Sequence, residues 1–175
     1  MIQILSADAQ KAVYGVTYYS VEKNKSRAVI YASTPTTDAA PVMLTADGSA
    51  EYAPSFIPGT DKVAYLAPDA DGAMQLWMMN ADGSARKQIS FEVTDVNDYL
   101  FSPCGKKVIL VKTITHEKSV QQNDADLQLT TGIVANDLIY KHWDHYTTSA
   151  PHPFVADFDG NKVGESKDLL EGEPY

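Results

Sequence analysis

An internal repeat constrains the fold of this chain more than any other feature of its sequence. Three segments align: SADAQKAVYGV (6–16), IPGTDKVAYLA (57–67) and SPCGKKVILVK (102–112). Each has a polar turn, then a lysine, then an apolar run. The lysines, at positions 11, 62 and 107, are 51 and 45 residues apart. A repeat of roughly 40–50 residues indicates one supersecondary unit used several times.

The repeated unit is built from short strands and tight turns. Runs such as DKVAYL and AMQLWMMN contain β-branched or aromatic residues, which favour strands. LWMMNADGS (76–84) resembles PFVADFDGN (153–161), and MLT (43–45) lies 45 residues before QIS (88–90). Asp-Gly dipeptides accept positive φ at hairpin turns and occur at 71–72, 82–83 and 159–160. A fourth, in ADGS (46–49), lies at another phase of the repeat and is interpreted as a loop between blades. Four short strands in such a unit are typical of a β-propeller blade.

The sequence therefore predicts an all-β protein, a partial β-propeller of about three four-stranded blades with a helical insertion in the third. The blades are expected at about 2–46, 52–91 and 97–171, with the insertion at about 113–152. Propellers close with four to eight blades, so we expect these residues to be part of a larger molecule. A β-sandwich in which the repeat is accidental is the alternative.

Composition narrows the classes of partner. The net charge is −9 and no Lys/Arg run occurs, which argues against binding nucleic acid. No apolar run approaches the length of a membrane span. The single cysteine, Cys104, allows no internal disulfide and no multi-cysteine zinc site, and we interpret it as an incidental turn residue. No cofactor is expected.

The stretch DLIYKHWDHY (137–146) lies inside the insertion and concentrates aromatic, histidine and acidic residues. His142 and His145 are three apart, a spacing that can place two metal ligands on one helical face. However, no clear third ligand and no HExxH motif accompany them. On a helix, His142 falls on an apolar face that could dock the helix, while Asp144 falls on a polar face that could contact substrate. We expect packing rather than a metal.

A family resemblance runs along the chain. The segments that carry it are YGVTYYSVEKNKS (14–26), QLWMMNADGSARKQIS (75–90), ANDLIYKHWDHY (135–146), PHPFVADFDG (151–160) and DLLEGEPY (168–175). Together they resemble the N-terminal propeller of bacterial type V dipeptidyl peptidases, of the prolyl-oligopeptidase family of serine peptidases. The blade repeat alone is also similar to TolB-like periplasmic propellers. Two turns, SADAQK and SPCGKK, depart from the Ser-Pro-Asp-Gly type that is usual in the family.

The resemblance implies that catalysis and substrate access belong to different domains. Catalytic Ser, Asp and His would lie in a C-terminal α/β-hydrolase domain, and no Gly-x-Ser-x-Gly nucleophile elbow occurs in these 175 residues. We therefore expect no catalytic residue here. The propeller would gate access to the active site and help to bind the peptide α-amine, which is cationic near neutral pH. By position, Glu173 is the best candidate for this contact and Asp144 the second.

The expected partners are the remainder of the propeller, the hydrolase domain and peptide substrates. The parent protein is expected to be periplasmic or secreted, although Met1 leads directly into IQIL without a visible signal peptide. A separate chain of this length is expected to self-associate through its terminal blade faces, or to fray at its outer strands. The alternative function is a TolB-like propeller that binds proteins and has no catalytic domain.

Overall fold

The computed structural model describes residues 4–45, 50–115, 118, 120–124, 126–132 and 149–173, and these are almost wholly strands and turns. The strands are β1 (Ala12–Ser20), β2 (Lys25–Ser33), β3 (Val42–Met43), β4 (Tyr52–Phe56), β5 (Lys62–Pro68), β6 (Met74–Asn80), β7 (Lys87–Gln88), β8 (Val96–Phe101), β9 (Lys107–Thr115), β10 (Ser149–Asp157) and β11 (Lys167–Asp168). One short helix, α1 (Val120–Asn123), is present in the described part. It is far too short to cross a membrane, and no other described helix could do so.

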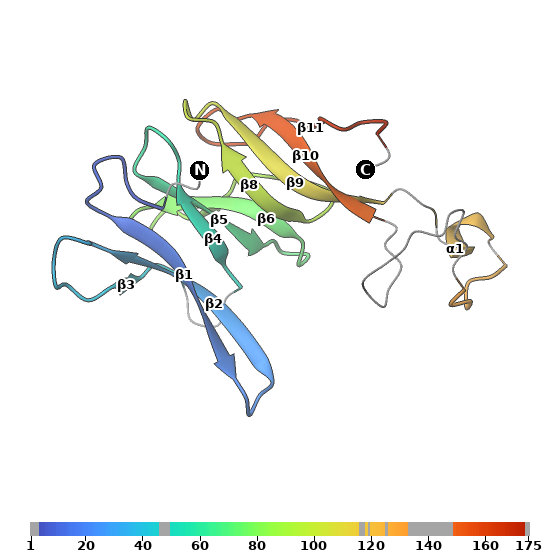
Figure 1. The fold of residues 1–175 in the computed structure, drawn as a ribbon, viewed down its shortest axis with the longest axis horizontal. Helices are drawn as coiled ribbons and strands as arrows, with labels where there is room; N and C mark the ends of the chain where they lie inside the picture. The colour runs from blue at the N-terminus through green and yellow to red at the C-terminus, as the bar shows by residue number, and fades with distance from the viewer. Residues whose placement is uncertain are drawn as a thin grey trace.

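The strands form three antiparallel sheets that follow one another along the chain (Figure 1). Sheet A has the order β1-β2-β3, sheet B has β4-β5-β6-β7 and sheet C has β8-β9-β10-β11. In every sheet each strand pairs with its neighbour in sequence. Such a succession of meanders is what a repeat of hairpins predicts. Sheet A has three named strands rather than the four expected, and a single bridge between Leu5 and Ala12 marks the fourth position.

The aligned segments make the same backbone contacts. In each first turn, an amide donates to the carbonyl of the aligned lysine at 2.9 Å: Ser6 to Lys11, Ile57 to Lys62 and Ser102 to Lys107. A left-handed residue occurs in every copy of this turn: Ala9 (φ 55°) in the first, Gly59 (φ 76°) in the second and Gly105 (φ 67°) in the third. Ala9 therefore holds a conformation that glycine adopts more easily.

The outermost strands also correspond. The amide of Leu44 donates to Ile30 and that of Ile89 donates to Leu76, both at 2.8 Å. The buried hydroxyls of Thr45 and Ser90 then accept the amides of these same partners, Ile30 at 2.9 Å and Leu76 at 2.8 Å. MLT and QIS therefore recur at the same position of the repeat because each provides one backbone hydrogen bond to the neighbouring strand and one hydroxyl that accepts an amide of that strand.

The third copy of the repeat lacks both the amide donor and the hydroxyl acceptor of the second of these hydrogen bonds. The amide of Leu169 donates to Pro153 at 3.0 Å, which keeps the strand contact. Pro153 has no amide to offer a hydroxyl, and Leu170 stands where the repeat would place one. The loss of the donor therefore leaves no unsatisfied acceptor behind.

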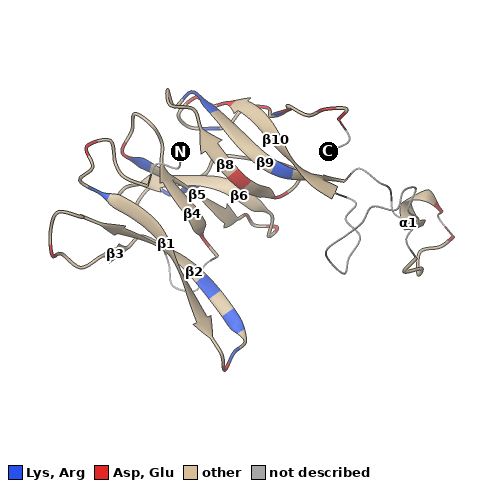
Figure 2. Cartoon of the chain, in the orientation of Figure 1, with Lys and Arg blue, Asp and Glu red and all other residues tan. Residues whose placement is uncertain are grey.

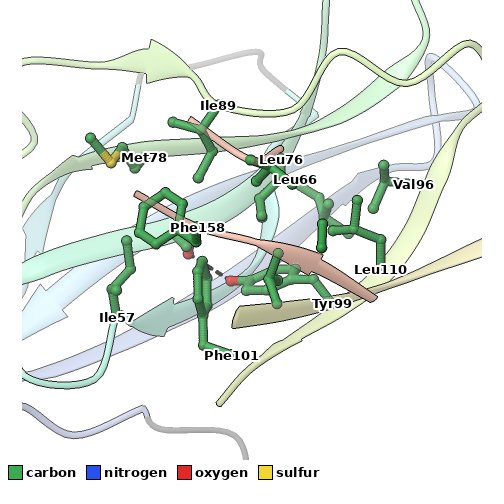
Figure 3. Close-up of a cluster of buried hydrophobic side chains, with 14 of the residues drawn as sticks. Ile57, Leu66, Leu76, Met78, Ile89, Val96, Tyr99, Phe101, Leu110 and Phe158 are labelled. Carbon is green, nitrogen blue, oxygen red and sulfur yellow. Dashed lines mark hydrogen bonds between the residues drawn. The ribbon is translucent and has the colours of Figure 1, made fainter. Parts of the chain in front are cut away.

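Two hydrophobic cores lie between the sheets. The first, between sheets B and C, contains Leu66, Leu76, Val108, Leu110 and Phe154 among fifteen buried residues. In this core Phe101 meets the rings of Tyr99 and Phe158 edge-on, with ring centroids 5.9 and 5.2 Å apart (Figure 3).

The second core lies between sheets A and B and includes Val13, Ile30, Val63, Tyr65 and Met79. Because side chains alternate along a strand, β5 sends Ala64 and Leu66 to one core and Val63 and Tyr65 to the other. Sheet B is therefore covered on both faces, whereas sheets A and C each have one face that no described sheet covers.

The insertion is carried by the β9–β10 hairpin. β9 and β10 pair over nine residues, ending at Thr115 opposite Ser149. The strands thus continue a little way into the segment 113–152 that the sequence assigned to the insertion. The connecting segment leaves the end of this hairpin and carries α1 (Figure 1). The helix expected over 137–146 lies outside the described residues.

Candidate functional site

The predicted amine ligand Glu173 lies in a turn after β11. Its amide donates to the carbonyl of Leu170 at 2.9 Å, and its side chain is exposed. The described residues do not enclose it, so its predicted role stays a prediction. Asp144, the second candidate, lies outside the described residues, as do His142 and His145. Among the described residues, no group of three metal-binding side chains comes together.

Cys104 is exposed in the turn between β8 and β9. Its Sγ lies 3.3 Å from the Ser102 Oγ. This hydrogen bond and the backbone amide of Lys106 lower the pKa of the thiol. A nucleophilic cysteine also needs a base that takes part in the reaction, and Ser102 cannot serve as one. The prediction of a turn residue fits this environment.

A buried polar cluster, which sequence reasoning did not find, lies where sheets B and C meet. We define the seam cluster as Glu92, Lys112 and Ser166. The Lys112 Nζ donates to a Glu92 carboxylate oxygen at 2.6 Å and to the Ser166 Oγ at 2.9 Å. Ser166 in turn donates to the same Glu92 oxygen at 3.0 Å. The Lys112 and Glu92 side chains are only 10% and 14% exposed.

The seam cluster joins three parts of the chain that are distant in sequence. Glu92 lies between β7 and β8, Lys112 lies on β9 and Ser166 directly precedes β11. The Lys112 Nζ also sits 3.7 Å from the centre of the Phe154 ring, a cation–π contact. Most other charged residues lie in loops and at strand ends (Figure 2). A charge that is buried between sheets must be paired, and these contacts provide the pairing.

A second polar pair joins β10 to β11. The Nδ1 atom of the buried His152, on β10, lies 2.9 Å from a carboxylate oxygen of Asp168, on β11. Partial burial acts to raise the pKa of Asp168, but the Leu170 amide and His152 outweigh it, and the pKa lies below its usual value. His152 stands where the repeat has Gln75, which is also buried and binds the Ser90 hydroxyl and the backbone of Glu92. This position therefore connects the third strand to the fourth in both sheets.

The geometry of the seam cluster favours a structural role. Ser166 and Lys112 are close enough to act as nucleophile and base, but a lysine that acts as a base needs a neutral amine. Here the ammonium is held in an ion pair with Glu92. A hollow of about 570 Å3 opens beside the cluster, and its rim carries Asp157, Asp159, Lys162 and Glu165. The rim carries both positive and negative side chains, so it does not favour ligands of one charge over ligands of the other.

One sequence signal did point to the seam cluster. Lys112 aligns with Ala67 of the second copy, whose side chain is buried in the core between sheets A and B. A lysine at an inward position of an alternating strand implies a buried acid nearby. The identity of that acid could not be read, because Glu92 and Ser166 are fixed only by the packing of sheet B against sheet C.

The place of the insertion also follows from the repeat. It connects the second and third strands of sheet C, and the equivalent connections are the short loops 21–24 in sheet A and 69–73 in sheet B. Equivalent loops of stacked repeats lie at the same end of the molecule. The insertion therefore follows the end of β9 in sheet C that corresponds to the end of β1 in sheet A.

Comparisons with known proteins identify proteins to which this chain is related. No family model matches the chain. Dipeptidyl-peptidase 5 of Porphyromonas gingivalis is 36% identical over 171 residues, which cover 98% of this chain and 25% of that protein. The chain is homologous to a segment of dipeptidyl-peptidase 5. The protein of the same name from Porphyromonas endodontalis is 31% identical over 181 residues, covering 98% of this chain and 24% of its own length.

The resemblance to dipeptidyl peptidases that the sequence carries is thus confirmed, and the chain spans about a quarter of the length of these two relatives. Solved structures support the fold. An acylaminoacyl peptidase from Pyrococcus horikoshii matches with a TM-score of 0.62 at 16% identity, covering 91% of this chain and 23% of its own. A TolB-like protein from Agrobacterium tumefaciens matches with 0.59 at 20% identity, covering 96% and 49%. The predicted fold class, an all-β partial propeller, is confirmed.

Proposed function

We propose that this chain is the non-catalytic propeller portion of a serine dipeptidyl peptidase that releases dipeptides from peptide N-termini. The observation that carries the proposal is the 36% identity to dipeptidyl-peptidase 5 across 98% of the chain. The 175 residues contain no Gly-x-Ser-x-Gly elbow, so nucleophile, base and oxyanion hole would come from the rest of the protein. The parent protein is proposed to be periplasmic or secreted, where peptides from outside the cell arrive.

Within that enzyme the propeller portion is proposed to gate substrate entry and to bind the free α-amine. A carboxylate binds an ammonium through a charge-assisted hydrogen bond, and a fixed carboxylate would measure two residues from the amine to the bond that is cut. Glu173 and Asp144 are the proposed ligands. The net charge of −9 supports the attraction of an amine-bearing substrate to this portion.

The full-length natural protein tests both parts of this proposal. Its hydrolysis of dipeptidyl substrates is measured with the isolated 175-residue chain as the control, and the isolated chain is expected to give no turnover. The variant Glu173→Gln in the full-length protein is expected to raise KM about tenfold or more, since a hydrogen bond to a charged group contributes about 1.5–3 kcal/mol. Glu165→Gln, which changes an exposed acid elsewhere in the same blade, serves as the matched control.

A substrate whose α-amine is acetylated separates amine binding from other effects. If Glu173 binds the amine, Glu173→Gln narrows the difference in KM between substrates with a free and with an acetylated α-amine, whereas Glu165→Gln leaves this difference unchanged. Unaltered discrimination in Glu173→Gln shifts the assignment to Asp144, tested in the same way by Asp144→Asn. Turnover by the isolated chain, blocked by a serine-directed inhibitor, contradicts the non-catalytic role.

The alternative is a propeller that binds proteins and has no catalytic partner domain. The similarity to the TolB-like protein, of which this chain covers about half, favours this reading. The long insertion between β9 and β10 argues for the peptidase, because a scaffold does not need such an element in one blade. A full-length protein without dipeptidyl hydrolysis supports the scaffold.

A further inference from the structure

The turn of the β1–β2 hairpin contains a modification motif that the proposed function does not use. Its sequence is EKNKS (22–26). An asparagine with a serine or threonine two positions later, and with no proline between them, is the acceptor pattern of N-glycosylation. Asn24 is the only asparagine in the sequence that has this pattern. Bacterial transferases also require an acid two positions before the asparagine, and Glu22 stands there.

The acceptor groups of this motif are exposed. All residues from Val21 to Ser26 are exposed, and the hairpin projects beyond the strands that pack against it (Figure 1). Within the described part of the chain, neither the Asn24 side-chain amide nor the Ser26 hydroxyl makes a hydrogen bond. A transferase needs the amide as the nucleophile and the hydroxyl to hold that amide in place. Both groups are therefore available to an enzyme that approaches the tip of the hairpin.

The conformation of the turn explains only part of the motif. Asn24 has a left-handed φ of 46°, and its backbone amide donates to the Val21 carbonyl at 3.2 Å. Asparagine, aspartate and glycine all accept this conformation, so the turn alone accounts for the residue at position 24. The turn does not require a hydroxyl at Ser26, which lies on β2, where β-branched and aromatic residues are favoured.

Asn161 provides a comparison within the chain. It is also exposed, lies in the turn after β10 and precedes a lysine, Lys162. Its side-chain oxygen accepts the Lys87 Nζ at 2.8 Å, and the residue two positions later is the buried Val163. Asn161 is thus a turn asparagine with structural contacts, whereas Asn24 combines a turn position with exposed acceptor groups.

A hollow of about 370 Å3 lies beside Asn24 and Ser26, and Tyr19 also lines it. Tyr19 pairs with Ser26 across the two strands and is 81% exposed. The face of an aromatic ring carries a partial negative charge, which attracts the C–H groups of a sugar. Tyr19 therefore provides a surface for the first sugar unit attached to Asn24.

We propose that Asn24 is a site of N-glycosylation. The Asn24 Nδ2 forms a bond to the anomeric carbon of an oligosaccharide carried on a polyprenyl diphosphate. The bond from that carbon to the diphosphate breaks, the diphosphate leaves with the electron pair, and the amide nitrogen loses one proton to a base of the transferase. The inference rests on the proposed periplasmic or secreted location, where such transferases act, and does not depend on the proposed catalytic role.

Mass spectrometry of the full-length natural protein, purified from the cells that produce it, tests the proposal. Cleavage after glutamate gives the fragment 23–51, in which Asn24 is the only asparagine. We expect this fragment to carry the additional mass of an oligosaccharide and to release sugar ions when it is fragmented. An unmodified fragment overturns the proposal. Cell fractionation then shows whether the proposed location fails with it, and dipeptidyl hydrolysis reports on the catalytic role separately.

Variants of the same full-length protein separate the modification from the turn. Asn24→Asp keeps a residue that accepts the left-handed φ but removes the amide nitrogen, and Ser26→Ala removes the hydroxyl, so both are expected to lose the sugar. Ser26→Thr retains the motif and is expected to keep the sugar, as is the control Asn161→Asp. Thermal unfolding checks that the variants fold. A sugar on the fragment 23–51 that survives Asn24→Asp or Ser26→Ala overturns the assignment to Asn24.

Discussion

Lys112 shows how one residue can depart from a repeat without disturbing it. Its repeat partner is Ala67, so the third copy places an ammonium where the second has a methyl group. The Glu92 carboxylate, the Ser166 hydroxyl and the Phe154 ring surround that charge. Because the ammonium and the carboxylate have both left water, each depends on the other for its stability.

Replacing Lys112 by Met is expected to destabilise the chain by about 3 kcal/mol, because Glu92 is left as an unpaired and largely buried carboxylate. The control is Lys107→Met on the same strand, where the ion pair with Asp157 is 59% and 81% exposed and is expected to contribute less than about 1 kcal/mol. Urea unfolding measures both, and the double variant Lys112→Met/Glu92→Gln is expected to recover part of the loss. Equal costs for Lys112→Met and Lys107→Met would falsify the assignment of Lys112 to a buried pair.

At the level of elements, hydrogen bonds to aspartate side chains stabilise the equivalent turns of sheets B and C. The Asp82-Gly83 and Asp159-Gly160 turns are equivalent, and each glycine has a left-handed φ, of +85° and +90°. Asp82 accepts the hydroxyl of Ser84 at 2.6 Å and its amide at 2.9 Å, and Asp159 accepts the amides of Lys162 and Asn161, both at 2.7 Å. These bonds lower the pKa of both carboxyls. Their contribution to stability is therefore present above about pH 4 and is lost as the pH falls through the lowered values.

The two glycines differ only in what lies around them, and this provides a matched test. A Cβ on Gly83 would lie 2.8 Å from the backbone oxygen of Leu44 in the adjoining sheet, whereas a Cβ on Gly160 has no neighbour within 4 Å. Gly160→Ala is expected to cost about 1 kcal/mol, for the left-handed conformation alone. Gly83→Ala is expected to cost clearly more, because sheet A must move away from sheet B. Thermal unfolding compares the two, and equal shifts in Tm contradict a close approach at Gly83.

The sequence predicted these elements to different degrees, for physical reasons. The polar turns and the strands after Lys11, Lys62 and Lys107 were predicted correctly, since alternation and turn residues act locally. The equivalence of the Asp82-Gly83 and Asp159-Gly160 turns was also read correctly. The seam cluster was not predicted, because its members are brought together only by the packing of two sheets. The role of Glu173 as an amine ligand rested on family resemblance and stays a prediction.

For the whole molecule, the sheets differ in how well they are covered. Sheet B packs on sheet A through one face and on sheet C through the other, and β5 is buried from Val63 to Ala67. Sheets A and C each bury one face only, and the β1–β2 hairpin extends beyond the strands that pack against it (Figure 1). In repeat proteins, stability comes largely from the interfaces with neighbours, so the central unit is the most stable.

Hydrogen exchange on the single chain is expected to reproduce this order. The chain is measured at low concentration, where contacts between copies do not contribute. Amides of β5 and β6 are expected to exchange at least about tenfold more slowly than those of β11 and of the outer half of the β1–β2 hairpin, because opening them exposes both cores. Equal protection of all three sheets in the dilute chain shows instead that the 175 residues unfold as one unit, and the view of sheet B as the stable centre then fails.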